Sequence, residues 1–311
     1  MIARRIAQSI PLLLLVSLLV FALLHAVPGG PLAIYLENPG VRPEDIERLR
    51  RSLGLDQPLP VQYIQWLAGF VRGDWGFSLS DGRPVAERML ERAPATLELA
   101  GVSLLVAVIA ALPLGIVAAV RRGGWFDRLS SGVALAGVSL PVFWFGLVLQ
   151  LVVALGLGWL PSSGRSSVFD SGVADRLRHL VLPAIVLAAV HAAGWSRYLR
   201  AAMIGILDQR FIQAGAARGV PARALYLRHA LRNAAGPLVA LIFMDAALLV
   251  SGAVVTESVF AWPGLGGLFT EALARRDYPV LMAFLMVTSV AVIVLNLLAD
   301  LAHRAIDPRV T

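Results

Sequence analysis

The chain of 311 residues is 58% hydrophobic and 15% charged with a mean hydropathy of +0.75, whereas soluble domains are about 45–50% apolar and about 25% charged, so much of the chain must face lipid. There is no cysteine, which excludes disulfides and thiolate metal sites. All 27 basic residues are arginine, which excludes a standard P-loop ATPase because that motif needs a lysine; the arginines lie beside apolar spans, so the +7 charge does not indicate nucleic acid binding.

Six apolar segments are long enough to cross a membrane as helices, which takes ~20 mostly apolar residues. They are Ile6–Val27, Leu97–Val120, Leu129–Leu157, Leu180–Leu199, Gly236–Val255 and Pro279–Leu301. Pro141 predicts a kink or an interfacial tail in the long third segment. The first segment follows Arg4 and Arg5 but is longer than the roughly 7–15 apolar residues of a signal peptide, so we expect it to remain as a helix.

The arginines in short loops predict the orientation, because cytoplasmic loops carry an excess of them. With the N-terminus inside, the cytoplasmic segments hold Arg4, Arg5, Arg121, Arg122, Arg128, Arg197, Arg200, Arg210, Arg218, Arg223, Arg228, Arg232, Arg304 and Arg309. The two short outer loops hold Arg165, Arg176, Arg178, Arg275 and Arg276. We therefore expect both termini to be cytoplasmic.

The first outer loop, residues 28–96, is long enough to fold on its own. Pro43 opens one predicted helix, which Gly54 can end, and Pro60 opens a second. The second predicted helix carries an apolar stripe with helical spacing that fits a membrane surface or a neighbouring helix: Tyr63, Trp66, Leu67, Phe70 and Val71. Two interpretations stay open, a structural cap over a pore mouth and a docking surface for an outer partner.

The basic segment Asp208–Arg232 predicts two short helices joined by a tight elbow. Asp208 is a candidate N-cap, Gly219 a helix stop and Pro221 a first-turn residue. Gly215 and Gly219 have GxxxG spacing, but flanking arginines exclude a dimerising membrane span. The segment is either a solvated basic loop near anionic lipid or a rigid lever that another protein grips.

The residues Gln213-Ala214-Gly215 with Gly219 resemble the EAA loop, E-A-A-x-x-x-G, of binding-protein-dependent ABC importer permeases. Gln213 departs from the glutamate of that pattern. The run Arg228–Asn233, followed by Pro237, is similar to the dipeptide/oligopeptide/nickel branch of the family.

Other segments resemble the same branch, and the long first outer loop resembles its B-type member. The similarity covers the chain from end to end: residues 53–59, 62–63, 73–78, 84–85, 96–99, 257–266, 276–279 and 307–310.

The resemblance implies an all-α type I ABC importer permease fold with six transmembrane helices and a folded helical outer loop. It divides the chain into residues 1–27 (first span), 28–96 (outer loop) and 97–311 (five-helix core with a coupling hairpin at 208–235). The residues it implies for coupling to the ATPase are Gln213, Ala214, Gly215, Gly219, Val220, Pro221 and Arg228.

The implied function is to form half of a translocation pathway in a bacterial inner membrane, with di- or oligopeptides as the expected cargo. The implied partners are a second homologous permease, two cytoplasmic ATPase subunits that bind ATP and Mg²⁺, an outer substrate-binding protein and membrane lipid. The chain itself would hold no cofactor, and we expect it not to be an enzyme.

Asp245 lies midway along the fifth apolar segment, where a carboxylate costs roughly 2.5–3.5 kcal/mol and must face protein or water. It and Gln150 are candidates for the substrate pathway. The alternative for Asp245 is an interhelical hydrogen bond to Gln150 or Asn296, and His191 is expected to be packed. The resemblance of the last outer loop makes a further set candidates for an outer gate or docking surface: Glu257, Trp262 and Asp277.

Two other functions compete with the importer. A stand-alone secondary transporter would show internal repeats and buried ion ligands, which we do not detect. A non-catalytic membrane assembly subunit needs no chemistry, so only the basic hairpin argues against it. An intramembrane hydrolase lacks a nucleophile motif, and no His or carboxylate cluster with metal-ligand spacing is present in the sequence.

Overall fold

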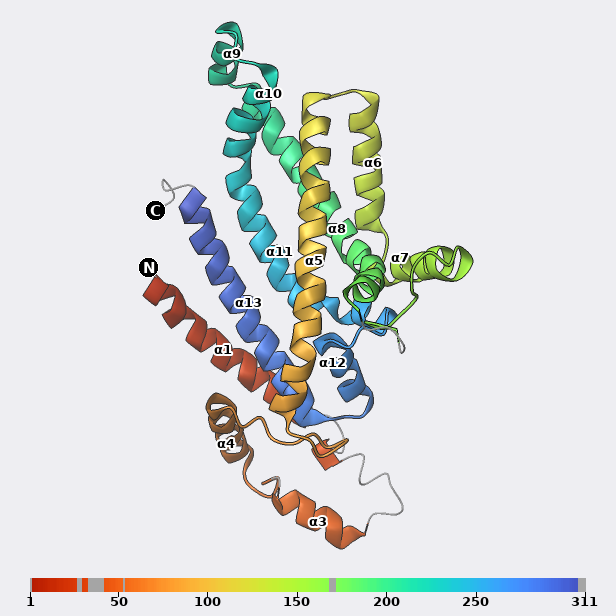
Figure 1. Ribbon diagram of the computed structural model, residues 1–311. Coiled ribbons are helices and arrows are strands. Elements are labelled where there is room, and N and C mark those ends of the chain that lie inside the picture. The colour runs from red at the N-terminus through yellow and green to blue at the C-terminus, as the bar shows by residue number, and fades with distance from the viewer. Residues whose placement is uncertain (1, 27–29, 33–41, 53, 168–171, 307–311) are drawn as a thin grey trace. The chain divides into compact units, whose positions relative to one another are not determined.

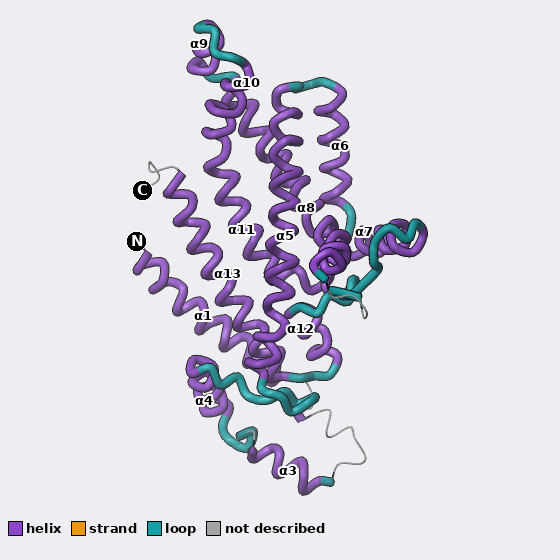
Figure 2. The backbone as a smooth tube through the Cα atoms, viewed as in Figure 1, coloured by secondary structure: helices purple, strands orange, loops and turns teal. Residues whose placement is uncertain are grey.

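The computed structural model describes residues 2–26, 30–32, 42–52, 54–167 and 172–306. The predicted end of the first span at Val27 and the motif at 307–310 therefore lie outside the described residues. Within them, regular structure is helical (Figure 2), apart from an isolated antiparallel bridge between Phe77 and Pro84. The elements are α1 (Ile2–His25), η1 (Gly30–Leu32), α3 (Pro43–Ser52), α4 (Leu59–Arg72), α5 (Val85–Val120), α6 (Trp125–Ser139), α7 (Val142–Leu149), η2 (Gln150–Gly156), α8 (Val173–Leu207), α9 (Arg210–Ala217), α10 (Ala222–Ala224), η3 (Leu225–Ala230), α11 (Leu231–Val259), α12 (Leu265–Ala274) and α13 (Tyr278–Ile306).

The described helices confirm a multi-span membrane protein. Five are long and apolar enough to cross a membrane, or up to 6 if a bent pair counts as one span. The five are Ala7–His25, Val85–Val120, Val173–Leu207, Ala222–Ala247 and Tyr278–Ala302. The bent pair, Trp125–Ser139 with Val142–Gly156, is the predicted third span. The six predicted spans thus all correspond to apolar helices of the structure.

The third span breaks sharply at Pro141. Its two halves meet at an angle of 105° (Figure 1). Leu140, the residue before the proline, leaves the helical region with φ −83° and ψ 134°. A proline ring disfavours helical backbone in the preceding residue and has no N–H to donate. The predicted kink is therefore a full change of direction.

Several helices extend well beyond the predicted apolar segments. The helix of the second span begins at Val85 instead of Leu97, and α8 covers 35 residues. A helix of that length measures about 50 Å, more than the ~30 Å of a bilayer core. The arginine-bearing turns at the ends of these helices can therefore remain helical outside the lipid.

The chain divides into two compact units, residues 1–95 with 263–293 and residues 96–262 with 294–311. In the second unit, the main core is built from α5, α8, α9 and α11. Trp195 and Leu199 of α8 are buried there among alanines of α5 and α11. A Cβ on Gly115 of α5 would lie 2.9 Å from Leu199 Cβ, so a glycine is needed for this approach. Small residues that allow close helix contact are typical of membrane bundles.

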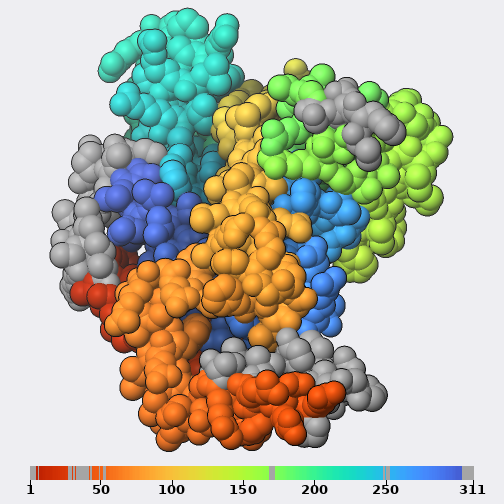
Figure 3. All heavy atoms as spheres, turned by 60° about the horizontal axis from the view of Figure 1, so that its bottom comes forward, coloured from red at the N-terminus to blue at the C-terminus, as the bar shows by residue number. Residues whose placement is uncertain are grey.

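In the first unit, the two predicted outer-loop helices are present as α3 and α4. Gly73, with φ 86°, ends α4. The aromatic stripe of α4 packs on a neighbouring helix: Tyr63 and Trp66 contact a small core formed by Phe21 of α1 and Met282 of α13. The hydroxyls of Ser17 and Tyr63 are 2.8 Å apart. Figure 3 shows the atoms of the segment from α3 to the start of α5 as one continuous surface.

Candidate functional site

The hairpin after α8 is a tight turn with a defined backbone cap (Figure 1). Gly219 follows α9 with φ 79°. The Gly219 N–H donates to Ala216 O at 2.9 Å, and the Val220 N–H donates to Gly215 O at 3.1 Å. This pair of bonds is a Schellman motif, which satisfies the last carbonyls of a helix and favours glycine at the left-handed position. The predicted helix stop is therefore present, and we call residues 218–221 the elbow.

The hairpin is stiffened by one close contact inside it. A Cβ on Gly215 would meet Leu225 Cδ2 at 2.9 Å, closer than real side-chain contacts allow. Leu225 is buried. Ile212 of α9, the helix that carries Gly215, is also buried and belongs to the core formed by α5, α8 and α11. The hairpin is thus joined to the spans by packed apolar side chains, not only by its two chain connections.

The other face of α9 is open to solvent. Gln213 and Ala214 are exposed, as is Arg228 farther along. The Gln213 amide nitrogen donates to Asp208 O at 3.3 Å. Asp208 does not act as the predicted N-cap, because Gln209 occupies that position without a side-chain cap bond. Asp208 instead lies 3.4 Å from Arg122 in an exposed ion pair.

The second helix of the hairpin was predicted to be short and separate, and this prediction is wrong. Pro221 is the N-cap of α10, which continues through the π-helix η3 into α11. The continuous helix Ala222–Ala247 is one of the spans. The elbow therefore connects directly to the fifth span without an intervening loop.

At membrane depth, Asp245 of α11 is held by two side chains of α8. Trp195 Nε1 donates to Asp245 Oδ2 at 2.6 Å, and His191 Nδ1 lies 3.6 Å from the same oxygen. The His191 and Trp195 rings are 5.5 Å apart. Asp245 thus makes an interhelical bond, but to partners other than the predicted Gln150 or Asn296.

The side chain of Gln150 donates to two backbone carbonyls and not to Asp245. Its amide nitrogen donates to Ser162 O at 2.7 Å and to Val259 O at 2.9 Å. These carbonyls belong to the loop after η2 and to the end of α11. Gln150 therefore joins the bent third span to the end of the fifth span.

Glu257 and Trp262 are both buried at the turn that follows α11. Thr96 Oγ1 donates to Glu257 Oε1 at 2.6 Å. The Trp262 N–H donates to Glu257 O at 2.8 Å, and the guanidinium of Arg165 lies 5.9 Å from the centre of the Trp262 ring. Glu257 and Trp262, two of the three predicted outer-gate residues, thus have partners within the chain.

Asp277 is buried in the first unit and organises a loop before α5. The hydroxyl of Ser78 and the N–H groups of Leu79 and Ser80 donate to its carboxylate. Arg88 Nη1 lies 3.7 Å away and also donates to Ser78 Oγ. Asp277 therefore fixes the segment 78–80 against the start of α13.

Sequence reasoning missed three ion pairs in the second unit. Arg200 of α8 binds the buried carboxylate of Asp127 in α6 through two nitrogens. Glu98 binds Arg165 and Arg176. Asp127 is an acidic residue among Arg121, Arg122 and Arg128 beside an apolar span, and that charge contrast was the available signal.

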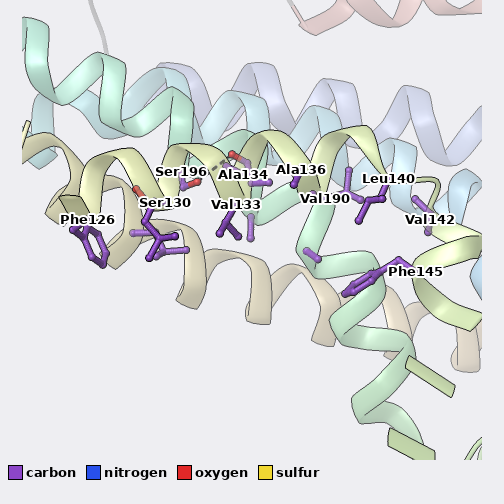
Figure 4. Close-up of a pocket in the computed structure, with 16 residues that line it drawn as sticks. Phe126, Ser130, Val133, Ala134, Ala136, Leu140, Val142, Phe145, Val190 and Ser196 are labelled. Carbon is purple, nitrogen blue, oxygen red and sulfur yellow. Dashed lines mark hydrogen bonds between the residues drawn. The ribbon is translucent and has the colours of Figure 1, made fainter. Parts of the chain in front are cut away.

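An apolar cavity of about 500 Å³ lies beside α6. Figure 4 shows Phe126, Ser130 and Val133 of α6 along it, with Phe145 beyond the break. Its lining contains no charged side chain among the described residues, so it offers no counter-charge to a polar solute. In the part of the chain that is described, no group of three or more His, Asp or Glu side chains could hold a metal ion.

Comparison with family models identifies the chain. Residues 111–311 match the model described as "Binding-protein-dependent transport system inner membrane component", and residues 1–100 match its N-terminal companion. The chain belongs to this family of inner-membrane permeases. It is therefore a transmembrane permease subunit of an ATP-driven importer, as the sequence motifs predicted.

Curated relatives match the permease along its full length. It is 38% identical to the oligopeptide transport system permease protein AppB of Bacillus subtilis over 99% of this chain and 98% of the relative. It is 36% identical to the dipeptide transport system permease protein DppB of Escherichia coli K12, with coverage of 99% and 98%. The glutathione transport system permease protein GsiC of Escherichia coli K12 is 38% identical, with coverage of 99% and 98%.

Among solved structures, the permease resembles inward-facing conformations of the MetNI methionine ABC transporter. One crystal form gives a TM-score of 0.57 at 19% identity and covers 70% of this chain and 95% of that chain. A second gives 0.58 at 18% identity, with coverage of 70% and 96%. The similarity confirms the type I importer permease fold.

Proposed function

We propose that this permease forms half of the translocation pathway for di- or oligopeptides and couples it to a separate ATPase through residues 208–235. The cargo assignment is supported by relatives named for oligopeptides, dipeptides and the tripeptide glutathione. The coupling assignment is carried by the hairpin geometry: α9 has one exposed face, and its buried Ile212 packs into the core formed by α5, α8 and α11.

A coupling element must keep its shape while a partner moves it, because only a stiff element transmits a shift between two states. The hairpin meets this requirement through the Gly219 cap and the Gly215–Leu225 contact. The exposed residues Gln213 and Ala214 would meet the ATPase cleft, with Val220 and Pro221 forming the turn. Arg228 would contact the ATPase from the second helix.

The partners follow from the same proposal. A second homologous permease completes the pathway, and two cytoplasmic subunits bind ATP and Mg²⁺, since this chain has no lysine for a P-loop. The chain is therefore not an enzyme in its own right. An outer binding protein delivers the cargo.

We place the permease in the bacterial inner membrane with both termini in the cytoplasm, on the strength of the arginine distribution. In this arrangement residues 1–27 form the first span, 28–96 the outer loop and 97–311 the core. The hairpin then lies on the ATPase side.

Asp245 and Gln150 are assigned to the substrate pathway. The carboxylate of Asp245 is partly exposed and would attract the ammonium group of a passing peptide, while Trp195 holds it in place. Glu257, Trp262 and Asp277 would act at the outer gate as positioning residues, because each is buried and shapes a loop that can itself meet the binding protein.

The test is to purify the transporter with its accompanying subunits, reconstitute it and measure dialanine uptake and ATP hydrolysis together. Ala214→Trp should lower uptake at least tenfold while the amount of permease in the membrane stays normal. Ala201→Trp, at an exposed alanine of α8 outside the hairpin, is the matched control. Normal uptake by a well-expressed Ala214→Trp variant would contradict the coupling role, and purification of the chain alone would contradict the importer assembly.

A further inference from the structure

The first unit contains a second, more polar cavity of about 280 Å³. It lies among α1, α4, the turn after α4 and the first residues of α13. Its lining includes Gln62, Trp66, Trp75, Asp74 and His25. The cavity has no part in the coupling or pathway roles proposed above. Its lining combines hydrogen-bond acceptors with aromatic rings.

Gln62, one of the lining residues, has an unused acceptor. Its Nε2 donates to Gln57 O at 2.7 Å, while Oε1 is buried and has no hydrogen-bond partner among the described residues. A buried acceptor without a partner is costly, so native structures supply a partner to nearly all of them. A ligand with an N–H donor would satisfy Gln62 Oε1.

Two further acceptors line the same cavity. His25 Nδ1 lies 2.8 Å from Phe21 O, so this nitrogen carries the proton and Nε2 is an acceptor. Asp74 Oδ1 accepts from the Gly76 N–H at 3.1 Å, and its second oxygen accepts no hydrogen bond in the described part of the chain. Asp74 also contributes the negative charge of the cavity.

Aromatic rings complete the lining and are held in fixed orientations. Trp75 stacks on Phe70 with ring centres 5.3 Å apart, and its Nε1 donates to Phe70 O at 3.2 Å. Trp66 lies 6.0 Å from Phe21. The faces of tryptophan rings attract cations, best of all the aromatic side chains. No arginine is among the described residues of the lining, so nothing there would repel a cation.

We propose that this cavity binds an ammonium group. Gln62 Oε1 and His25 Nε2 would accept its N–H bonds, Asp74 would supply the counter-charge, and Trp66 and Trp75 would present ring faces. Two sources share this chemistry: the headgroup of a phosphatidylethanolamine lipid and the N-terminus of a peptide. The volume of about 280 Å³ is large enough for either group but not for a folded partner.

The experiment uses the full chain purified with its accompanying subunits and two matched pairs of probes. Dihexanoyl phosphatidylethanolamine is compared with dihexanoyl phosphatidylglycerol, which lacks the ammonium group. Dialanine is compared with N-acetyl-dialanine, in which the ammonium group is blocked. Binding is followed by tryptophan fluorescence and, for lipid, by native mass spectrometry.

The variants separate the site from the rest of the outer segment. Asp74→Asn keeps the acceptor for Gly76 but removes the charge, and should weaken binding of the ammonium probe about fivefold to tenfold. Gln62→Glu should strengthen it, and Gln62→Leu should weaken it. Asp56→Asn, at an exposed carboxylate outside the cavity, is the matched control and should leave binding unchanged.

The outcomes identify the source or overturn the proposal. Binding of phosphatidylethanolamine that depends on Asp74 identifies a lipid site, and dialanine binding with the same dependence identifies a cargo site. Equal binding of the blocked and unblocked probes, or equal behaviour of Asp74→Asn and Asp56→Asn, would overturn it. Failure of the coupling test would leave these results unaffected, because they do not involve ATP.

Discussion

The elbow after α9 and the turn after α11 have the same backbone cap but different surroundings. In both turns the residue after the C-cap has positive φ, 79° at Gly219 and 47° at Ala261. In both, the next N–H reaches back to the carbonyl at the start of the last helical turn: Val220 to Gly215 and Trp262 to Glu257. The two turns differ in the burial of the residues around the cap.

At the turn after α11, Trp262 and Glu257 are buried, with exposures of 1% and 0%. At the elbow, Gly219 is exposed and nothing lies within 4 Å of where its Cβ would be. An alanine in left-handed backbone costs about 1–2 kcal/mol, so Ala261 persists because its neighbours are held by burial and hydrogen bonds. The elbow has no such surroundings and relies on glycine.

The turn after α12, in the first unit, resembles the turn after α11 and not the elbow. Arg276 has φ 49°, and the Asp277 N–H donates to Ala272 O at 2.8 Å. Asp277 is fully buried, as Glu257 is. A buried carboxylate thus accompanies each strained turn without glycine, whereas the proposed ATPase-facing turn is unstrained and accessible.

The largest effect should come from removing a buried carboxylate. Asp277→Ala removes the carboxylate that accepts from the Leu79 and Ser80 N–H groups, and it takes away the buried one of the carboxylates near Arg88. Breaking such a buried charged contact costs about 3–5 kcal/mol. We expect a large drop in thermal unfolding temperature in detergent, with Asp277→Asn intermediate. An unchanged unfolding temperature for Asp277→Ala would show that the turn does not depend on this carboxylate.

Enlarging Gly215 should stop coupling without unfolding the chain. Gly215→Val places methyl groups against Leu225, and overpacking of this kind costs about 1–3 kcal/mol. We expect uptake by the reconstituted transporter to fall about tenfold or more.

Leu225→Ala combined with Gly215→Val makes room for the new side chain and should restore part of the uptake, because neighbouring residues are coupled. Gly205→Val, at an exposed glycine of α8 with open space around it, is the matched control. Equal losses at both glycines would mean that the contact with Leu225 is unimportant.

Replacing the elbow glycine should have a moderate effect. Gly219→Ala introduces left-handed strain of about 1–2 kcal/mol but no collision, since the space around it is open. We expect a modest decrease in uptake that Gly219→Asn partly restores, because asparagine tolerates this conformation. An uptake with Gly219→Ala equal to that of wild type would remove the argument for a conformational requirement.

The smallest effect is expected at the turn after α11, where the substitution should stabilise the chain and not destabilise it. Ala261→Gly relieves strain and should stabilise the folded chain by about 0.5–1 kcal/mol after the added freedom of the unfolded chain is counted. The difference between the thermal unfolding temperatures of Ala261→Gly and of the wild type measures this stabilisation. Destabilisation would show that the alanine methyl group contributes packing that outweighs its backbone strain.

The sequence predicted the features that depend on local chemistry. Gly219 was recognised as a helix stop because glycine favours positive φ, and Pro141 as a disturbance of the third span. The angle of 105° was not predictable, since it depends on the packing of the two halves. Asp208 was wrongly predicted as an N-cap because Gln209 precedes α9 directly.

Contacts between distant residues could not be predicted. Asp245 was recognised as a carboxylate at membrane depth that must face protein or water, but its partner Trp195 is 50 positions away and no spacing rule connects them. The bond between Ser78 and Asp277 spans 199 positions. Such pairs depend on how the helices pack, which one sequence does not record.

The π-helix at Leu225–Ala230 has a consequence for the phase of the fifth span. A π-turn holds one more residue than an α-turn, so the side chains before and after it are offset by about 100° of helical rotation relative to an uninterrupted α-helix. The face that packs against α9 is therefore rotated, relative to the face of α11 that carries Asp245, from where an uninterrupted α-helix would place it. A single-residue deletion in η3 would bring the two faces into α-helical phase, and the hairpin would be turned about the axis of the helix on which it is mounted.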